Sequence, residues 1–286
     1  MTLAYVLALG SAVFYGAGDF TGGLATRRAR VIPVVLISQA SGLLLLALLL
    51  RFLPHASPTR TDFLWGAAAG LTGGIGIALL YRALAIGTMS VVSPVTAVCA
   101  VAIPVVYAMA RGERPLPIAL WGMVLGVVSI VLVSRQQATV TDEPTGRGRH
   151  SGVGTALASG VAIGFFFITF SRSGSSAGMW PLLAARLVSV SLFTIVAIVA
   201  RQSMRMPGPV LRLVIVGGIL DMIANALYVL ATRNGPLSIV VTLSSLYPAS
   251  TVLLARGILK ERLSRWQVTG VAAALAAVVL IVLGSN

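Results

Sequence analysis

Residues 83–110, ALAIGTMSVVSPVTAVCAVAIPVVYAMA, form the longest stretch of the chain without a charged side chain. A helix needs about 20 mostly apolar residues to cross a bilayer, so this stretch is long enough to span one. Further uncharged stretches occur at 1–18, 31–50, 63–81, 115–134, 151–171, 234–255 and 266–286. Each is continuous, whereas the strands of a membrane barrel alternate apolar and polar residues over segments of about ten. The runs therefore indicate membrane helices.

The composition agrees with this interpretation. Of the 286 residues, 57% are hydrophobic and only 10% are charged, whereas soluble domains carry about 25% charged residues. A soluble fold is therefore excluded. The net charge of +14 does not indicate a nucleic-acid partner, because the basic residues are spread in small groups between the apolar runs. With one cysteine and two isolated histidines, the chain offers no cluster for a metal or cofactor, and none is expected.

Two further apolar stretches, 180–200 and 211–232, are each interrupted by charged residues. Counting them, the sequence predicts an all-α integral membrane protein with ten transmembrane helices, at about 3–24, 32–50, 63–81, 88–109, 116–134, 152–171, 180–200, 211–231, 236–255 and 266–284. Six arginines lie on the side of the N-terminus, and fourteen basic residues lie on the other side. The positive-inside rule then predicts a multi-pass protein of the cytoplasmic membrane with both termini outside.

The chain also resembles itself at an offset of 148 residues. The pairs that align include Gly16 with Gly164, Pro33 with Pro181, and Glu113-Arg114 with Glu261-Arg262. Each half holds five predicted helices, an odd number, so the second half enters the membrane upside down. We therefore expect two inverted five-helix repeats, residues 1–138 and 149–286, joined by a polar linker at 139–148. Inverted repeats are typical of alternating-access transporters, whose site lies between the repeats near the membrane midplane.

Two short turns extend this comparison. Gly112-Glu113-Arg114 follows the fourth predicted helix, and Lys260-Glu261-Arg262-Leu263 follows the ninth. With five helices per half and Gly16 in the first, the chain resembles the drug/metabolite transporter superfamily, EamA type. That resemblance implies a ten-helix basket with a central cavity that moves small solutes, with export favoured over import. We expect Glu113 and Glu261 to cap the fifth and tenth helices or to pair with their arginine neighbours.

Charged residues at membrane depth cost at least about 2.5 kcal/mol on insertion scales, so each of them needs a reason. Arg186 and Asp221 lie on sequential helices, and the long arginine side chain is expected to reach the carboxylate. The pair can bind a charged substrate or take part in proton coupling, with Asp221 as the first candidate for the titrating group. It can equally be a structural ion pair between two helices.

Polar residues also recur at helical spacing, so that they share one face of a predicted helix. Asp221, Asn225, Tyr228 and Thr232 form one stripe, Ser11, Tyr15 and Asp19 a second, and Ser238, Thr242 and Ser245 a third. Asp19 has an alternative role, which is to pair with Arg27, Arg28 or Arg82. The candidate substrate-binding residues are Asp221, Asn225, Arg186, Tyr228, Tyr15, Asp19 and Ser245.

The sequence thus predicts a secondary active transporter, not an enzyme, for an amino acid-like metabolite or an amphipathic drug. Its partners are the substrate and membrane lipid, and protons are an open candidate for the coupling ion. No nucleotide-binding motif follows a strand, so an ion or solute gradient has to drive transport. Two alternatives remain: a membrane-embedded enzyme or lipid scramblase, and a passive channel. The sequence does not indicate an oligomeric state.

Overall fold

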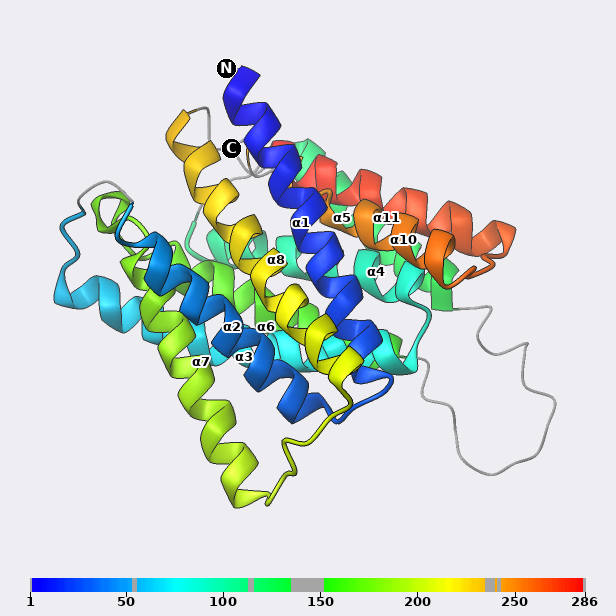
Figure 1. Cartoon of the computed structure of the whole chain (residues 1–286). Helices are drawn as coiled ribbons and strands as arrows, with labels where there is room; N and C mark the ends of the chain where they lie inside the picture. Colours follow the sequence, from blue (N-terminus) through cyan, green and yellow to red (C-terminus); the bar gives the residue numbers. More distant parts are fainter. Residues whose placement is uncertain are drawn as a thin grey trace.

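The computed structural model describes residues 2–52, 56–112, 116–134, 152–234, 240 and 243–284. Figure 1 shows this part as a bundle of long helices that cross one another at various angles. It contains ten α-helices: α1 (Thr2–Thr26), α2 (Val31–Leu49), α3 (Arg60–Ile86), α4 (Met89–Ala110), α5 (Pro117–Ser134), α6 (Val153–Phe170), α7 (Trp180–Val199), α8 (Gly208–Asn234), α10 (Tyr247–Ile258) and α11 (Arg265–Gly284).

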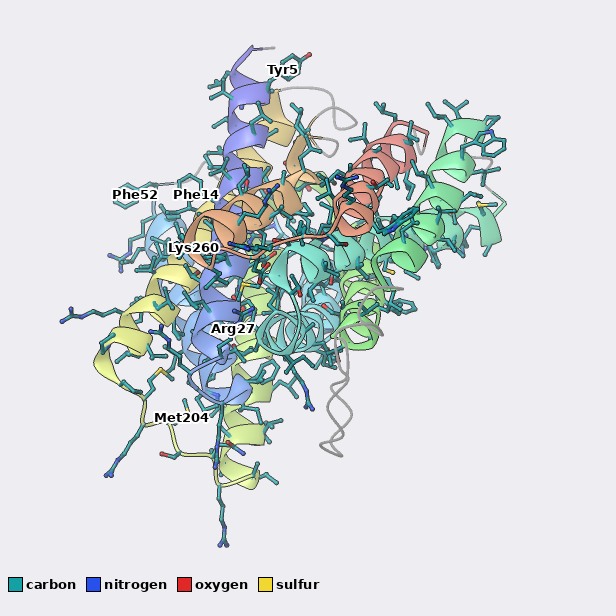
Figure 2. The ribbon with its side chains drawn as sticks, turned by 90° about the vertical axis from the view of Figure 1, so that its right-hand side faces the viewer. Tyr5, Phe14, Arg27, Phe52, Met204 and Lys260 are labelled. Carbon is teal, nitrogen blue, oxygen red and sulfur yellow. The ribbon has the colours of Figure 1, made fainter. Side chains whose placement is uncertain are left out.

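The helices follow the uncharged runs because a bilayer leaves no water for unpaired backbone groups, and the helix satisfies those groups internally. Six of them, α1, α2, α3, α6, α7 and α8, are long and apolar enough to cross a membrane, and shorter apolar helices lie at Met89–Pro104, Pro117–Ser129 and Val268–Gly284. Large apolar side chains face outward, among them Phe52, which is 83% exposed and projects from the surface in Figure 2. Such a surface requires lipid around it.

The structure corrects the bounds of the ninth predicted helix. A continuous helix over 236–255 is wrong, because α10 begins only at Tyr247, after a turn at Ser245 and Leu246, and runs on to Ile258. Pro248 lies in its first turn. Proline has no N–H to donate, and its ring clashes with the carbonyl four residues earlier, so the first turn of a helix, where neither group is needed, suits it best.

The packing of the helices confirms the two-repeat architecture. An offset of 148 residues relates α1 to α6, α2 to α7, α3 to α8, α4 to α10 and α5 to α11. α1 packs against α8, and correspondingly α6 packs against α3. In the same way α2–α8 matches α7–α3, and α1–α10 matches α6–α4. α2 and α7 pack against each other, as do α5 and α11, so these counterparts meet at the boundary between the repeats.

Individual hydrogen bonds repeat at the same offset. The Thr96 hydroxyl donates to the carbonyl oxygen of Ala156 at 3.2 Å, from α4 to α6. The Ser244 hydroxyl donates to the carbonyl oxygen of Ala8 at 3.4 Å, from the segment before α10 to α1. Adding 148 to the number of Thr96 gives Ser244, and subtracting 148 from that of Ala156 gives Ala8. The internal repeat is therefore preserved in side-chain contacts as well as in the order of helices.

Glycines allow the repeats to approach closely. A methyl group at Gly70 on α3 would overlap the carbonyl oxygen of Ala185 on α7. At the equivalent crossing, a methyl group at Gly218 on α8 would overlap the carbonyl oxygen of Ser38 on α2. Small residues at such crossings let membrane helices gain backbone contact. The two crossings hold α2, α3, α7 and α8 together around the charged residues described next.

Candidate functional site

Arg186 is the centre of a buried polar group. Its guanidinium donates from Nη1 to Oε1 of Gln39 and from Nη2 to Oδ2 of Asp221. The expected contact between Arg186 and Asp221 is therefore present, and the arginine is only 8% exposed. Gln39 lies on α2, Arg186 on α7 and Asp221 on α8. One side chain thus links the first repeat to the second.

The group lies deep in the helices. Asp221 is thirteen residues from Gly208 and thirteen from Asn234, the two ends of α8, which places it about 20 Å from each end. Arg186 is six residues into α7, or about 9 Å from its start. Removing two charges from water is costly, and the cost is offset only when further hydrogen bonds accompany the ion pair.

Neighbouring side chains supply these bonds. The Asn225 amide, one helical turn after Asp221, donates to the aspartate's carbonyl oxygen at 2.7 Å and to its Oδ2 at 3.4 Å. The Ser189 hydroxyl lies 3.2 Å from the carbonyl oxygen of Arg186 and 3.5 Å from Oε1 of Gln39. Asp221 and Asn225 of the predicted stripe on the eighth helix therefore join a network that includes α2 and α7.

Tyr15 and Asp19 extend the network onto α1. The Tyr15 side chain lies near Asp221, Arg186, Asp19 and Tyr228. α1 can lie against α8 because the glycine before Asp19 faces the backbone of Asp221. The structure therefore brings together six of the seven candidate residues. They are Arg186, Asp221, Asn225 and Asp19, with charged or amide side chains, and the tyrosines Tyr15 and Tyr228.

Asp19 does not pair with the basic flank. Its side chain is buried, 8% exposed, and makes no hydrogen bond or ion pair with another described residue. Arg27 instead lies 3.4 Å from a carboxylate oxygen of Glu261. Eight residues separate Asp19 from Arg27, about 12 Å along the helix, and Asp19 occupies the inward face. The prediction that Asp19 pairs with Arg27, Arg28 or Arg82 is therefore wrong.

Ser245, the seventh candidate, lies in the turn that precedes α10 and is partly buried. In the described part of the chain it makes no hydrogen bond to the Arg186 group. Two residues later, the Tyr247 ring meets the Tyr15 ring edge to face, with centroids 6.4 Å apart. The start of α10 therefore borders the site through Tyr247. The expected neighbours Ser238 and Thr242 lie outside the described residues.

Sequence reasoning missed Gln39, Ser38 and Tyr81. Gln39 is the only amide side chain in the run 31–50, a signal that was available. Tyr81 on α3 is 2% exposed and lies beside Ser38 on α2. A neutral side chain on an apolar helix is less conspicuous than a charge, because hydroxyl and amide groups commonly hydrogen-bond between membrane helices.

The polar site occurs at only one of the two equivalent helix interfaces that the repeat creates. The position equivalent to Asp221 is Gly73, and the position equivalent to Asp19 is Phe167. At Gly73 an added Cβ would lie 2.7 Å from the ring of Phe166. Aromatic packing therefore fills the interface between α3 and α6, where the matching interface between α1 and α8 holds carboxylates. The backbone is symmetric, but the chemistry is not.

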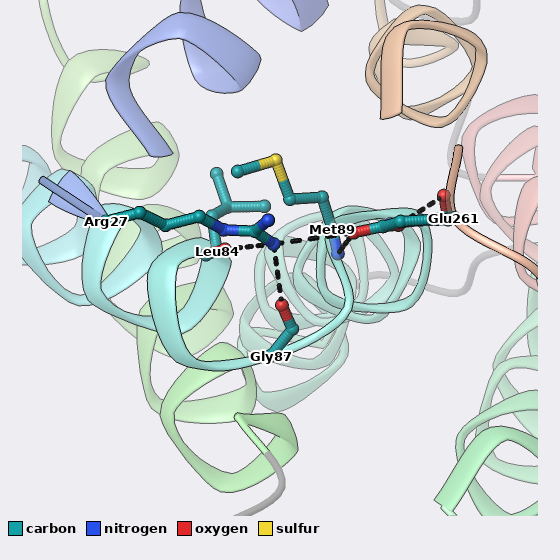
Figure 3. A network of polar contacts seen from close by, with 6 residues as sticks. Arg27, Leu84, Gly87, Met89 and Glu261 are labelled. Atoms are coloured by element: carbon teal, nitrogen blue, oxygen red, sulfur yellow. Dashed lines mark hydrogen bonds and ion pairs between the residues drawn. The ribbon is translucent and has the colours of Figure 1, made fainter. Parts of the chain in front are cut away.

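A second polar network lies at the start of α4 (Figure 3). Glu261 accepts hydrogen bonds from the backbone N–H groups of Met89 and Ser90, both at 3.1 Å, and from the Ser90 hydroxyl at 2.9 Å. A carboxylate at this place satisfies free N–H groups and complements the helix dipole. Glu261 thus caps α4 rather than the tenth helix, which corrects our expectation. Glu113 lies outside the described residues.

Arg27 completes this second network. Its Nη2 donates to Glu261, to the carbonyl oxygen of Gly87 at 3.2 Å and to that of Leu84 at 3.4 Å. The network joins the end of α1, the connection from α3 to α4, and the turn between α10 and α11. It therefore ties the two repeats together at one end of the bundle, away from the Arg186 group.

The Arg186 group is suited to noncovalent recognition. It presents a guanidinium, two carboxylates, amides and phenols, so it can bind solutes of either sign by ion pairs and hydrogen bonds. In the ranges that the structure describes, no three His, Cys, Asp or Glu residues gather as metal ligands do.

Comparisons with known proteins agree with this architecture. A solved crystal structure, titled only "Crystal structure of protein", superposes with a TM-score of 0.63 over 99% of this chain and 97% of that chain, at 17% sequence identity. At that identity the likeness shows the fold alone. No curated protein matches the chain. The EamA-like transporter family matches twice, at residues 2–135 and 150–283, which are again 148 residues apart. The chain is therefore a multi-pass membrane transporter that belongs to the EamA-like transporter family.

Proposed function

We propose that this chain is a secondary active transporter that exports a small organic solute across the cytoplasmic membrane by alternating access. Membership of the EamA-like family supports transport. The observation that carries the proposed mechanism is the buried contact of Arg186 with Gln39 and Asp221, at the boundary between the repeats. Transporters built from inverted repeats bind their substrates at such a boundary, near the membrane midplane.

The two bonds of Arg186 differ in what happens when the repeats move. Asp221 belongs to the same repeat as Arg186, whereas Gln39 belongs to the other. Rocking of one repeat against the other breaks the bond to Gln39 and keeps the ion pair with Asp221. The freed guanidinium N–H groups can then bind an acceptor on the substrate. A purely structural ion pair between α7 and α8 would not need the bond to Gln39.

The substrate that fits best is an amino acid-like metabolite or an amphipathic drug. Asp19 offers a carboxyl without a protein partner among the described residues, beside the phenol of Tyr15. Arg186 offers a cation on the other side of the same group. A solute with a cationic and an anionic or polar end can use both. Protons are the candidate coupling ion, with Asp221 or Asp19 as the carrier.

A thermal-shift screen tests the binding site first. Purified protein is compared with Asp221→Asn against amino acids, organic cations, nucleosides and sugar phosphates. A ligand at about 100 times its Kd raises stability by about 2.7 kcal/mol. We expect a ligand whose stabilisation disappears in Asp221→Asn and remains in Arg51→Gln. The second variant is the control, because it removes an exposed charge far from the site. Stabilisation that survives in Asp221→Asn would move the site elsewhere.

Transport in proteoliposomes tests the mechanism. With the ligand from the screen, we expect saturable uptake that is accelerated by the same solute on the opposite side. Flux that never saturates would instead indicate a channel. Under a pH gradient, Asp221→Asn and Asp19→Asn are compared with the parent. If both variants keep the parent's pH dependence, neither carboxyl carries the coupled proton.

A further inference from the structure

A groove of about 740 Å³ opens on the outer surface between α2, α3 and α7. Its walls are apolar and come from all three helices, with Ile32, Ile75, Leu79, Phe193 and Val196 among the lining residues. Arg30, Arg82 and Gln202 line it as well. It is separate from the Arg186 group, which lies on the inward faces of α7 and α8. The groove therefore has one apolar part and one cationic end.

The groove lies where lipid meets the protein. It is at the end of three membrane-crossing helices, beside the start of α2 and the end of α7, and these two helices pack against each other (Figure 1). From Arg82 to Ile75 the wall runs seven residues along α3, or about 10 Å toward the middle of the span. Ile75 is 48% exposed, and Ile198 near the end of α7 is 70% exposed. The apolar part therefore faces acyl chains.

The cationic end lacks a counter-charge. Arg30 and Arg82 are exposed, and neither forms an ion pair with a described residue; the two ion pairs in the described part use Arg27 and Arg186. Arg30 donates from Nη1 to Oε1 of Gln202 at 3.2 Å, a neutral acceptor. Figure 2 shows long side chains with nitrogen tips that project from this end of the molecule, near Met204. A phosphate would supply the missing charge.

We propose that this groove binds an anionic glycerophospholipid, with an acyl chain against the apolar wall and the phosphate between Arg30 and Arg82. Basic pockets between membrane helices recognise anionic lipid headgroups in this way. Arginine also binds phosphate with paired N–H groups, which gives geometric selectivity beyond charge. A lipid fits better than a soluble anion, because the groove continues from the charged end into the hydrocarbon layer.

Native mass spectrometry of the detergent-purified protein tests this site. Phosphatidylglycerol and phosphatidylcholine with identical acyl chains are titrated against the parent and Arg30→Gln/Arg82→Gln. The control, Arg256→Gln/Arg265→Gln, removes two exposed arginines from the other repeat on the predicted cytoplasmic side. Each basic residue near an anionic surface contributes enough that losing two should weaken phosphatidylglycerol binding about thirtyfold. The control should bind like the parent.

A second variant keeps the charges and fills the groove. Ala78 also lines the groove, and Ala78→Phe should block the acyl chain while both arginines remain. It should lose phosphatidylglycerol adducts as the arginine variant does. If the double arginine variant does not fold, phosphatidylglycerol binding is measured for Arg82→Gln alone and for Ala78→Phe. The proposal is overturned if phosphatidylcholine binds the parent as tightly as phosphatidylglycerol, or if the control loses as much binding as the groove variants.

Discussion

Arg186 and Gln39 hydrogen-bond across the boundary between the two repeats, from helices that occupy equivalent places in the two halves. Their own equivalents differ from them: Arg186 corresponds to Ser38, and Gln39 corresponds to Leu187. The bond therefore exists once, although the backbone offers the arrangement twice. If the repeats rock against each other as we propose, this one-sided contact would make the two directions of rocking unequal in energy.

The ion pair should show strong coupling between its partners. Asp221→Asn alone leaves the Arg186 cation buried without a carboxylate, which typically costs about 3–5 kcal/mol. Replacing both residues, as in Arg186→Met/Asp221→Asn, removes the uncompensated charge and should recover part of that loss. The measurement is thermal or denaturant unfolding of Asp221→Asn, Arg186→Met and the double variant in one detergent. Losses in the double variant that equal the sum of the single ones would show that the two side chains do not interact.

Gln39→Leu tests the bond between the repeats by introducing the residue found at the equivalent position 187. The substitution removes one acceptor from a charged donor, so it should cost about 1.5–3 kcal/mol of stability. Ser41→Ala is the matched control on α2, because among the described residues the Ser41 hydroxyl bonds only to the carbonyl oxygen of Ile37 in its own helix, at 2.7 Å. If both variants unfold at the same temperature, the guanidinium does not depend on Gln39.

The positions of most helices could be predicted from the sequence alone. Uncharged runs such as 31–50 become helices because lipid supports little else, so length and hydropathy are sufficient. The predicted bounds of the ninth helix are wrong because hydropathy does not register the missing N–H of Pro248. That proline lies in the first turn of a new helix. The third predicted helix, 63–81, is too short, because the charge of Arg82 ends the uncharged run, whereas α3 continues through Arg82 to Ile86.

The charged residues of the candidate site could be predicted from the sequence. Asp221 and Arg186 stand out in apolar runs because a charge in lipid needs a compensating partner. The partner of Glu261 was not predictable, because Glu261 caps the helix that begins at Met89, a residue 172 positions away in the sequence. Local reasoning assigns a carboxylate to the next helix in the chain. Only the packing of one repeat against the other brings α4 within its reach.

The cap on α4 should contribute measurably to stability. Glu261→Ala removes the acceptor for two backbone N–H groups and one hydroxyl, so it should lower the free energy of unfolding by about 1–2 kcal/mol, as loss of a helix cap does. Arg262→Gln, an exposed neighbour, serves as the control. Ser90→Ala should have a smaller effect, because the backbone bonds to Glu261 remain. Equal unfolding temperatures for Glu261→Ala and Arg262→Gln would contradict the cap.

The crossing of α3 and α7 should tolerate nothing larger than glycine at position 70. The added methyl of Gly70→Ala meets the backbone carbonyl of Ala185, which cannot turn aside as a side chain can. Overpacking of this kind costs about 1–3 kcal/mol and should separate α7, with Arg186, from α3. Gly257→Ala makes the same change in α10, where nothing lies within 4 Å, and should leave stability equal or higher by up to about 1 kcal/mol. Unfolding of both variants in detergent compares them, and a Gly70→Ala protein as stable as Gly257→Ala would show that the two helices do not cross this closely.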